Sequence, residues 1–317
     1  MKNSRTHTYR VQALLMALTL ALTAILAPLH ATAQDAALKL ALTPQNAQAK
    51  AQSKQLLEQE FKVVQEQAQA QAQAGPRLWY AGFGFDSGTG AFRGDVDLTE
   101  KRIKAINPNI LSYKLDNQVQ TRELDRPFAH LGSFQATFKH LGQQLRDQDF
   151  VVVLLSSHGN VGYIANQIGS RRYGDIAAHQ IKTVLQNLKD TPTIIIISAC
   201  FSGSLIPSLE APNRIILTAA SKDKASWGCS PLDQNTFFID ALLGDGFDPS
   251  LSLAANFEQT KLRVAKREEE GKLAASEPQI FIGTKMRDMA NQSLSEVLQH
   301  RVKATDANAK AATKEAK

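Results

Sequence analysis

The sequence predicts an α/β domain with a mostly parallel sheet and helices on both of its faces. Three runs of aliphatic and β-branched residues, at 150–155, 193–197 and 214–218, contain almost no polar position, which is typical of strands buried on both sides. Segments with helical periodicity separate these runs. Alternating strands and helices require crossover connections, and such connections build parallel sheets. About 200 residues are ample for one domain of this kind.

The remaining elements of the domain, which we place at 76–284, follow from the same patterns. Further strands are expected at 78–83, 110–113 and 279–282, and helices at 96–106, 134–145, 176–188, 236–243 and 251–270. Residues 285–317 begin as a helical segment and continue as a basic Lys/Ala tail, for which we expect disorder.

An Ala/Gln-rich segment, residues 34–75, precedes the domain. Gln-Ala repeats fill 67–74, and apolar side chains form only part of a helical stripe before them. The pattern predicts a helical arm or linker that need not pack tightly, with a propeptide as the alternative. Gly75-Pro76 ends the segment.

The first 33 residues have the pattern of a signal peptide. Lys2, Arg5 and Arg10 precede an apolar run at 11–26, and a small-residue cleavage site follows at 31–33. The run is short for a membrane span, although an uncleaved anchor helix is the alternative. We therefore expect an exported protein, periplasmic or secreted, with no stable membrane insertion after cleavage.

The net charge of +6 comes from the two ends of the chain. Residues 1–10 carry three positive side chains and no acids, and residues 301–317 carry five basic and two acidic ones. The body between them is therefore neutral. A nucleic-acid partner requires clustered Lys and Arg on the folded domain, so none is expected. The oligomeric state is unknown from sequence.

Polar residues that can carry chemistry follow two of the predicted buried strands. Ser156-Ser157-His158-Gly159 comes after the run at 150–155, and Ser198-Ala199-Cys200 comes after the run at 193–197. Ligand sites of open α/β sheets lie beyond the carboxyl ends of strands. If the two strands are neighbours, an imidazole and a thiol meet there, as nucleophilic catalysis by cysteine requires. Alternatively, the histidine belongs to an ordinary turn and the cysteine to the core.

The surroundings of Cys200 suit a reactive thiol. The Ser-Gly-Ser that follows it predicts a turn that opens a helix, whose N-terminus would stabilise a thiolate. The backbone N–H groups of Gly159 and Cys200 would converge on one point, as an oxyanion hole requires. Cys200 and Cys229 are the two cysteines of the chain, and one disulfide between them is the alternative. No metal or organic cofactor is expected, because the other histidines show no ligand spacing with carboxylates or cysteines.

Several blocks of the sequence together resemble the legumain family of cysteine peptidases (C13, caspase-like). Ser-His-Gly at 157–159 and Ser-Ala-Cys-Phe-Ser-Gly-Ser at 198–204 are similar to the catalytic blocks, Thr218–Cys229 is similar to a further block, and Ser276–Phe281 to bacterial members in particular. The resemblance spans 77–284 and implies a caspase- or hemoglobinase-like fold and a peptide or protein substrate. It implies that His158 is the catalytic imidazole, Cys200 the nucleophile and Gly159 an oxyanion donor.

The resemblance also implies substrate-binding residues. Arg93 falls where the family has an arginine that lines a pocket for asparagine, and Ser226 matches a pocket serine. Cys229 matches a family cysteine outside the catalytic pair, so we expect it to pack. The family pattern has different residues at three positions, which makes a preference for asparagine doubtful: Gly94 stands for a histidine, Ala91 for an asparagine and Ser198 for a glutamate.

The function expected from these residues is that of a cysteine-type endopeptidase. Cys200 would form a thioester with the substrate, and His158 would act as acid and base. Two alternatives stay open. An amine instead of water would accept the acyl group in a transpeptidase or ligase of the same family, and a non-catalytic envelope scaffold would keep the fold without the reaction.

Overall fold

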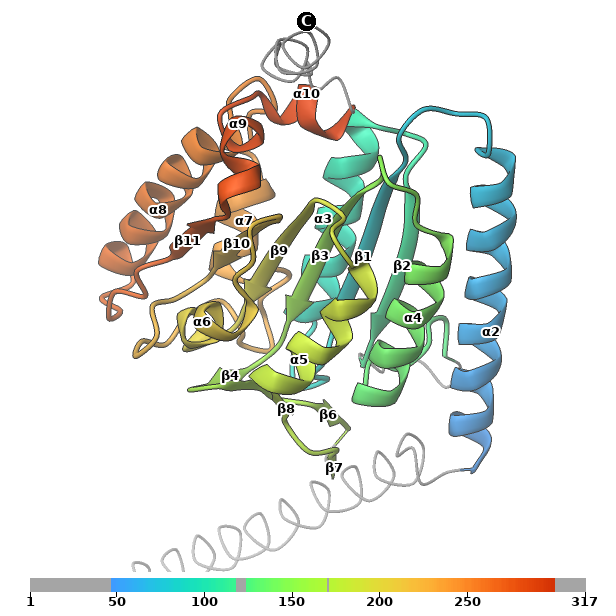
Figure 1. Ribbon diagram of the computed structural model, residues 1–317. Helices are drawn as coiled ribbons and strands as arrows, with labels where there is room; N and C mark the ends of the chain where they lie inside the picture. The colour runs from blue at the N-terminus through green and yellow to red at the C-terminus, as the bar shows by residue number, and fades with distance from the viewer. Residues whose placement is uncertain (1–46, 118–123, 170, 300–317) are drawn as a thin grey trace, which may run out of the picture.

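The structure is a computed structural model that describes residues 47–117, 124–169 and 171–299 (Figure 1). The expected signal peptide at 1–33 and most of the basic tail lie outside the described residues. No helix in the described part of the chain is long and apolar enough to span a membrane.

Six of the described strands form one central sheet. They are β1 (Leu78–Gly84), β2 (Leu111–Asp116), β3 (Phe150–Ser156), β9 (Thr193–Ser198), β10 (Arg214–Thr218) and β11 (Gln279–Ile282). The order is β11-β10-β9-β3-β1-β2, in which β11 is antiparallel to β10 and all other pairs are parallel. This confirms the predicted mostly parallel sheet and its strands, although β2 extends three residues beyond the expected end.

Each central strand places alternate side chains in two separate cores. In β9, Ile195 and Ile197 face one core, and Ile194 and Ile196 face the other. All four are at most 5 % exposed. The absence of polar positions that predicted these strands therefore results from burial on both faces.

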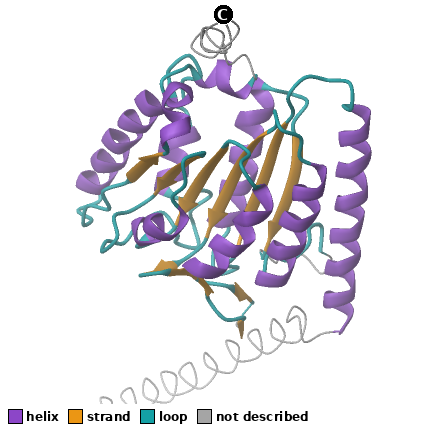
Figure 2. Cartoon of the chain, viewed as in Figure 1, coloured by secondary structure: helices purple, strands orange, loops and turns teal. Residues whose placement is uncertain are grey.

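Helices cover both faces of the sheet, as predicted (Figure 2). They are α2 (Ala47–Ala70), α3 (Ala91–Ile106), α4 (Leu131–Gln144), α5 (Ala178–Leu185), α6 (Ile206–Leu209), α7 (Phe237–Leu243), α8 (Leu253–Glu270), α9 (Arg287–Ala290) and α10 (Leu294–Leu298). Helices α2, α4 and α5 supply one core, and α3, α7, α8 and α10 supply the other. Helix α3 begins five residues earlier than the expected start at 96, because its first turn is buried at Ala91 and Phe92.

Helix α2 packs along the edge of the domain beside β2 and α4 (Figure 1). Its apolar side chains Val64 and Ala68 are each 2 % exposed, and the Phe61 ring stacks on His140 with centroids 4.4 Å apart. The expected helix is confirmed, but the expectation that it need not pack tightly is wrong for 47–70. Ala68, which belongs to the Gln-Ala repeat, continues the apolar stripe by another turn.

Short strands that the sequence did not predict follow β3. They are β4 (Gly159–Asn160), β5 (Tyr163–Ile164), β6 (Gln167–Ile168), β7 (Arg171–Arg172) and β8 (Ile176–Ala177). They pair in two small antiparallel sheets at the carboxyl edge of the central sheet (Figure 1). The helix expected at 176–188 is therefore shorter: residues 176–177 are strand, and α5 continues as a 3-10 turn at Gln186–Leu188.

Candidate active site

The paired strands β3 and β9 bring His158 and Cys200 to the same edge of the sheet. Ser156 lies opposite Ser198 in the last row of their parallel register. His158 and Cys200 each follow two residues later, and both are half-buried. The condition on which the predicted pair depended, that the two strands are neighbours, is confirmed.

A sharp turn follows Cys200. Phe201 has φ 57° and ψ 17°, a left-handed conformation that is uncommon for a residue with a side chain. Its N–H donates to the Lys224 carbonyl at 2.7 Å, which holds the turn against the segment that carries Ser226. The expected helix after the turn is a 3-10 turn, Ser202–Leu205, and then α6, a single short turn. The expected contribution of a helix N-terminus to a thiolate is therefore small.

Ser226 makes the contacts that hold the Cys200 sulfur. Its backbone N–H donates to Cys200 Sγ at 3.3 Å, and its hydroxyl lies 3.8 Å from the same atom. The thiol in turn donates to the Ser226 carbonyl at 3.5 Å. These contacts with Ser226 fix the position of the sulfur at the end of β9. The resemblance pointed to Ser226 as a pocket residue, and the structure places it directly beside the sulfur.

Gly159 lies against the backbone of Cys200. A Cβ atom built on Gly159 would be 2.5 Å from the Cys200 carbonyl oxygen and 3.0 Å from Ala199 Cβ. No side chain fits there, so glycine is required by close approach. Within the described part of the chain, the Cys200 N–H donates to no protein acceptor, which leaves it available to an oxyanion.

The His158 ring lies between an aromatic side chain and the loop after β1. The Phe92 ring meets it edge to face, with centroids 5.0 Å apart. On another side, Nε2 lies 3.9 Å from the point that a Cβ on Gly88 would occupy. Among the described residues, no hydrogen bond joins the ring to the Cys200 thiol. Catalytic hydrogen bonds are often long in structures without substrate and tighten when it binds.

Asp86, which the sequence analysis did not single out, is buried close to the His158 ring at 3 % exposure. Burial raises the pKa of this carboxyl, and the Gly88 N–H, the His158 charge and the Arg172 charge oppose that rise. Asp86 lies after β1. Ligand sites of open α/β sheets lie beyond the carboxyl ends of strands. The same principle that pointed to His158 and Cys200 could therefore have pointed to Asp86.

A second buried carboxylate, Asp95 of α3, supports both strand ends from beneath. Asp95 Oδ2 accepts hydrogen bonds from Ser156 Oγ at 2.7 Å and from Thr236 Oγ1 at 2.9 Å, and Oδ1 accepts one from Thr236 N at 2.9 Å. The Thr236 hydroxyl also lies 2.8 Å from Ser198 Oγ. One carboxylate thus links the residues that precede His158 and Cys200. Burial raises its pKa to about 6.

Arg93 lies in the first turn of α3, where carboxylates occupy its guanidinium group. It forms a bidentate ion pair with Asp125, and Nη1 lies 3.6 Å from Asp116 Oδ1. Its side chain is 21 % exposed. The structure therefore joins Arg93 to acidic side chains and does not bring it into contact with Cys200, unlike Gly159 and Ser226.

Cys229 is a second free thiol near the site. Neither cysteine forms a disulfide, so the alternative of a Cys200–Cys229 bond is not realised in the structure. Burial raises the pKa of the Cys229 thiol, and the nearby charges of Cys200, Asp233 and Asp86 act in the same direction. Cys229 is half-buried.

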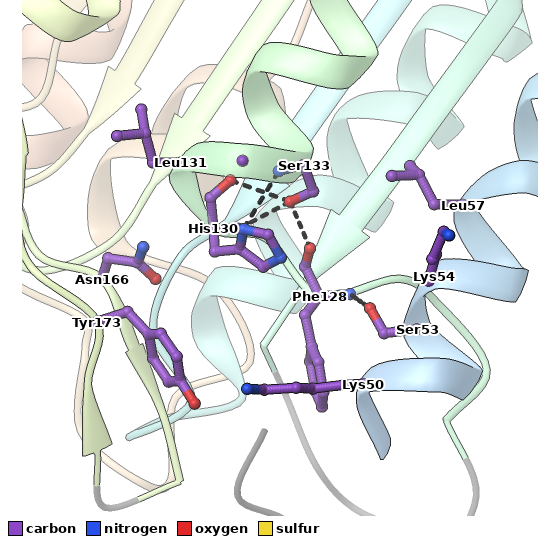
Figure 3. Close-up of a pocket in the computed structure, with 11 residues that line it drawn as sticks. Lys50, Ser53, Lys54, Leu57, Phe128, His130, Leu131, Ser133, Asn166 and Tyr173 are labelled. Atoms are coloured by element: carbon purple, nitrogen blue, oxygen red, sulfur yellow. Dashed lines mark hydrogen bonds between the residues drawn. The ribbon is translucent and has the colours of Figure 1, made fainter. Parts of the chain in front are cut away.

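A cavity of about 590 Å³ lies apart from these residues, between α2 and the start of α4 (Figure 3). His130 caps α4 there: its Nδ1 accepts from the Ser133 N–H at 3.2 Å. The lining includes Lys50, Leu57, Phe128, His130, Asn166 and Tyr173. Neither His158 nor Cys200 lines this cavity, so its size does not make it the candidate active site.

The sheet topology and the strand-end residues define an α/β protein with a cysteine–histidine pair at the carboxyl edge of a mostly parallel sheet. The profile of the Peptidase C13 family matches residues 133–298, more than half of the chain. The chain therefore belongs to the peptidase C13 family, a family of cysteine peptidases. The matched range contains His158, Gly159, Cys200 and Ser226, whereas Arg93 lies before it.

Solved structures include a similar one, the crystal structure of caspase-1 from Spodoptera frugiperda. The two sequences are 14 % identical, and the TM-score is 0.44. The match covers 65 % of this chain and 86 % of the caspase chain. No curated protein sequence matches the chain.

Proposed function

We propose that this chain is a cysteine-type endopeptidase in which Cys200 is the nucleophile and His158 the acid and base. The observation that carries the proposal is the common position of the two residues. Each follows the Ser156–Ser198 row of the paired strands by two residues. Their position at neighbouring strand ends supports this chemistry, which requires the thiol and the imidazole to come within hydrogen-bond reach of each other.

The reaction begins when the Cys200 sulfur attacks the carbonyl carbon of a peptide bond. The negative charge that develops on the carbonyl oxygen is stabilised by the N–H groups of Gly159 and Cys200. His158 gives its proton to the departing amine, and the acyl group stays on sulfur as a thioester. Water, deprotonated by His158, then attacks the thioester and releases the acid and the free thiolate.

Two contacts described above support these roles. The Ser226 N–H donates to the Cys200 sulfur and holds it in place for the attack. The missing side chain at Gly159 lets the segment after His158 lie against the Cys200 carbonyl, which brings the two proposed donors close together.

Substrate binding is proposed for Ser226 and Arg93. Ser226 touches the nucleophile, so its side chain would lie beside the substrate residue whose bond is cleaved. Arg93 would have to exchange its ion pair with the exposed Asp125 for a contact with substrate. For this reason we propose no asparagine preference.

We also propose that the protein is exported and that its N-terminal segment is removed at about residue 33. N-terminal sequencing of the protein from the culture medium and from the cell envelope tests this proposal. A mature protein that begins before the apolar run would contradict it.

The proposed activity is tested by incubating the reduced protein with a mixed peptide library and identifying the products by mass spectrometry. Cys200→Ala and His158→Ala should abolish cleavage, whereas Cys229→Ala, which removes the other thiol, should retain it. Undiminished cleavage by Cys200→Ala would contradict the proposal. If the products are joined to an added amine, the protein is a transpeptidase. If the protein is folded but forms no product that depends on Cys200, it is a non-catalytic scaffold.

A further inference from the structure

We propose that Asp86 is the positioning residue that orients the His158 imidazole, an inference that rests on the proposed peptidase function. The register of the sheet carries it. Gly84 of β1 lies opposite Ser156 of β3, and Ser156 lies opposite Ser198 of β9. Asp86, His158 and Cys200 each follow this row by two residues. A carboxylate, an imidazole and a thiol therefore stand on three adjacent strand ends, in that order.

Distances around Gly88 show that Asp86 and His158 face the same point. A Cβ atom on Gly88 would lie 2.9 Å from Asp86 Oδ1 and 3.9 Å from His158 Nε2. Nε2 is the one atom of the His158 ring within 4 Å of this point. The aromatic contact on the ring comes from Phe92, which has no side-chain acceptor.

The carboxylate retains an oxygen with which to accept from the ring. Asp86 Oδ1 accepts from the Gly88 N–H at 2.6 Å, while Oδ2 accepts no hydrogen bond from the described residues. An Nε2–H donor to this oxygen selects the tautomer in which neutral His158 carries no proton on Nδ1. The Nδ1 atom is then free to take a proton from the thiol or from water and to return it to the leaving amine.

The loop that carries Asp86 is fixed from both sides. Asp86 forms a β-bridge with Gln167, and Ser87 Oγ accepts from the Gly169 N–H at 2.7 Å. On the other side, the Thr89 hydroxyl donates to the Ser230 carbonyl at 2.7 Å. A carboxylate held in this way can fix a ring without moving itself, which is what positioning requires.

The charged and titratable groups that act on one another around Asp86 and Cys229 come from several elements. Asp86 comes from the loop after β1, Arg172 from β7, Cys200 from the end of β9, and Cys229 and Asp233 from the loop before α7. Asp86 is the one of these carboxylates whose oxygen shares a contact point with the ring. Burial raises the pKa of Asp86, and the nearby charge of His158 opposes that rise.

The test compares Asp86→Ala and Asp86→Asn in the full-length chain, with the exposed carboxylate variant Asp223→Asn as the matched control. Steady-state cleavage gives kcat and KM. Nitrogen NMR of labelled histidine gives the tautomer of the His158 ring, assigned with His158→Gln. Asparagine keeps an acceptor oxygen without the charge, so it should partly rescue both readouts. Gly88→Ala, which crowds Asp86 Oδ1, provides an independent variant if Asp86→Ala does not fold.

We expect Asp86→Ala to lower kcat by at least about tenfold with a smaller change in KM, because it removes an acid–base orientation. The neutral His158 ring should lose its preference for the Nε2–H form, and Asp86→Asn should lie between the two proteins. Equal kcat and equal ring signals in all proteins would overturn the inference. If the chain cleaves no peptide, the proposed function fails, and the ring signals alone decide the inference: a changed tautomer supports it and an unchanged one overturns it.

Discussion

The backbone N–H of Ser226 donates a hydrogen bond to the sulfur of Cys200 at 3.3 Å. The contact comes from the main chain, and the Ser226 hydroxyl is the more distant donor at 3.8 Å. The closer contact with the sulfur is therefore independent of the Ser226 side chain, whereas the proposed contact with substrate is not. These two roles can be separated experimentally.

Ser226→Ala is expected to leave the alkylation rate of Cys200 within about threefold of the unchanged protein, because the N–H remains. The same variant should raise KM for peptide cleavage, because the hydroxyl is proposed to touch substrate. Alkylation kinetics and steady-state cleavage on one preparation check both outcomes. An alkylation rate that falls as far as in His158→Ala would show that the hydroxyl, and not the backbone, controls the thiol.

Gly159→Ala should lower kcat about a hundredfold or more, which is the loss expected when an oxyanion donor is displaced. The added Cβ would lie 2.5 Å from the Cys200 carbonyl oxygen, so one of the two segments must move. Gly75→Ala, where a Cβ meets nothing within 4 Å, is the control for a general effect of the substitution. Cleavage by Gly159→Ala at the unchanged rate would remove Gly159 from the proposed oxyanion hole.

The part of the site that the sequence predicts is the part that directly follows a strand with a clear apolar pattern. His158 and Cys200 follow unbroken apolar runs, so periodicity alone places both of them at the carboxyl edge of the sheet. Asp86 follows β1 in the same way, but it lies in a glycine-rich loop that reads as a turn. The sequence predicts that such a loop exists and not which of its side chains points toward the histidine.

The network beneath the site depends on contacts that sequence does not show. Asp95 lies in a helix and accepts from Ser156 and Thr236, which are 61 and 141 residues away along the chain. The same limit explains helix α2, in which Ala68 contributes to the core although its neighbours in the Gln-Ala repeat do not. Periodicity gives the face of a helix, and only the tertiary structure shows whether a partner surface covers it.

Asp95→Asn should change how stability depends on pH. Burial raises the pKa of Asp95 from 3.8 to about 6, so in this range the folded chain binds more protons than the unfolded one. The stability that protonated Asp95 contributes is therefore present below its ordinary pKa and is lost as the pH rises through about 6. Relative to Asp95→Asn, the unchanged protein should lose about 3 kcal/mol of unfolding free energy across this range. Denaturant titrations at several pH values measure it, and parallel curves for the two proteins would contradict the assignment.

Glu60→Gln should tighten the packing of helix α2 above neutral pH. Burial raises the pKa of Glu60 to about 7, although the Lys114 N–H donates to its carboxylate and opposes the rise. Above this pH the packed helix must hold a buried charge, and stability is lost as that charge forms. Hydrogen exchange of the α2 amides should therefore be slower in Glu60→Gln at alkaline pH. Glu58→Gln, whose carboxylate is exposed beside Lys54, serves as the control, and equal exchange in the two variants would contradict the prediction.

Alkylation of the native protein by iodoacetamide at about pH 6, followed by peptide mapping, tests the central claim most directly, because only an activated thiol reacts well there. The account predicts selective labelling of Cys200 over Cys229, since burial raises the pKa of Cys229, and loss of that labelling in His158→Ala. Equal labelling of both cysteines, or labelling of Cys200 that does not depend on His158, would contradict a catalytic pair at the ends of β3 and β9.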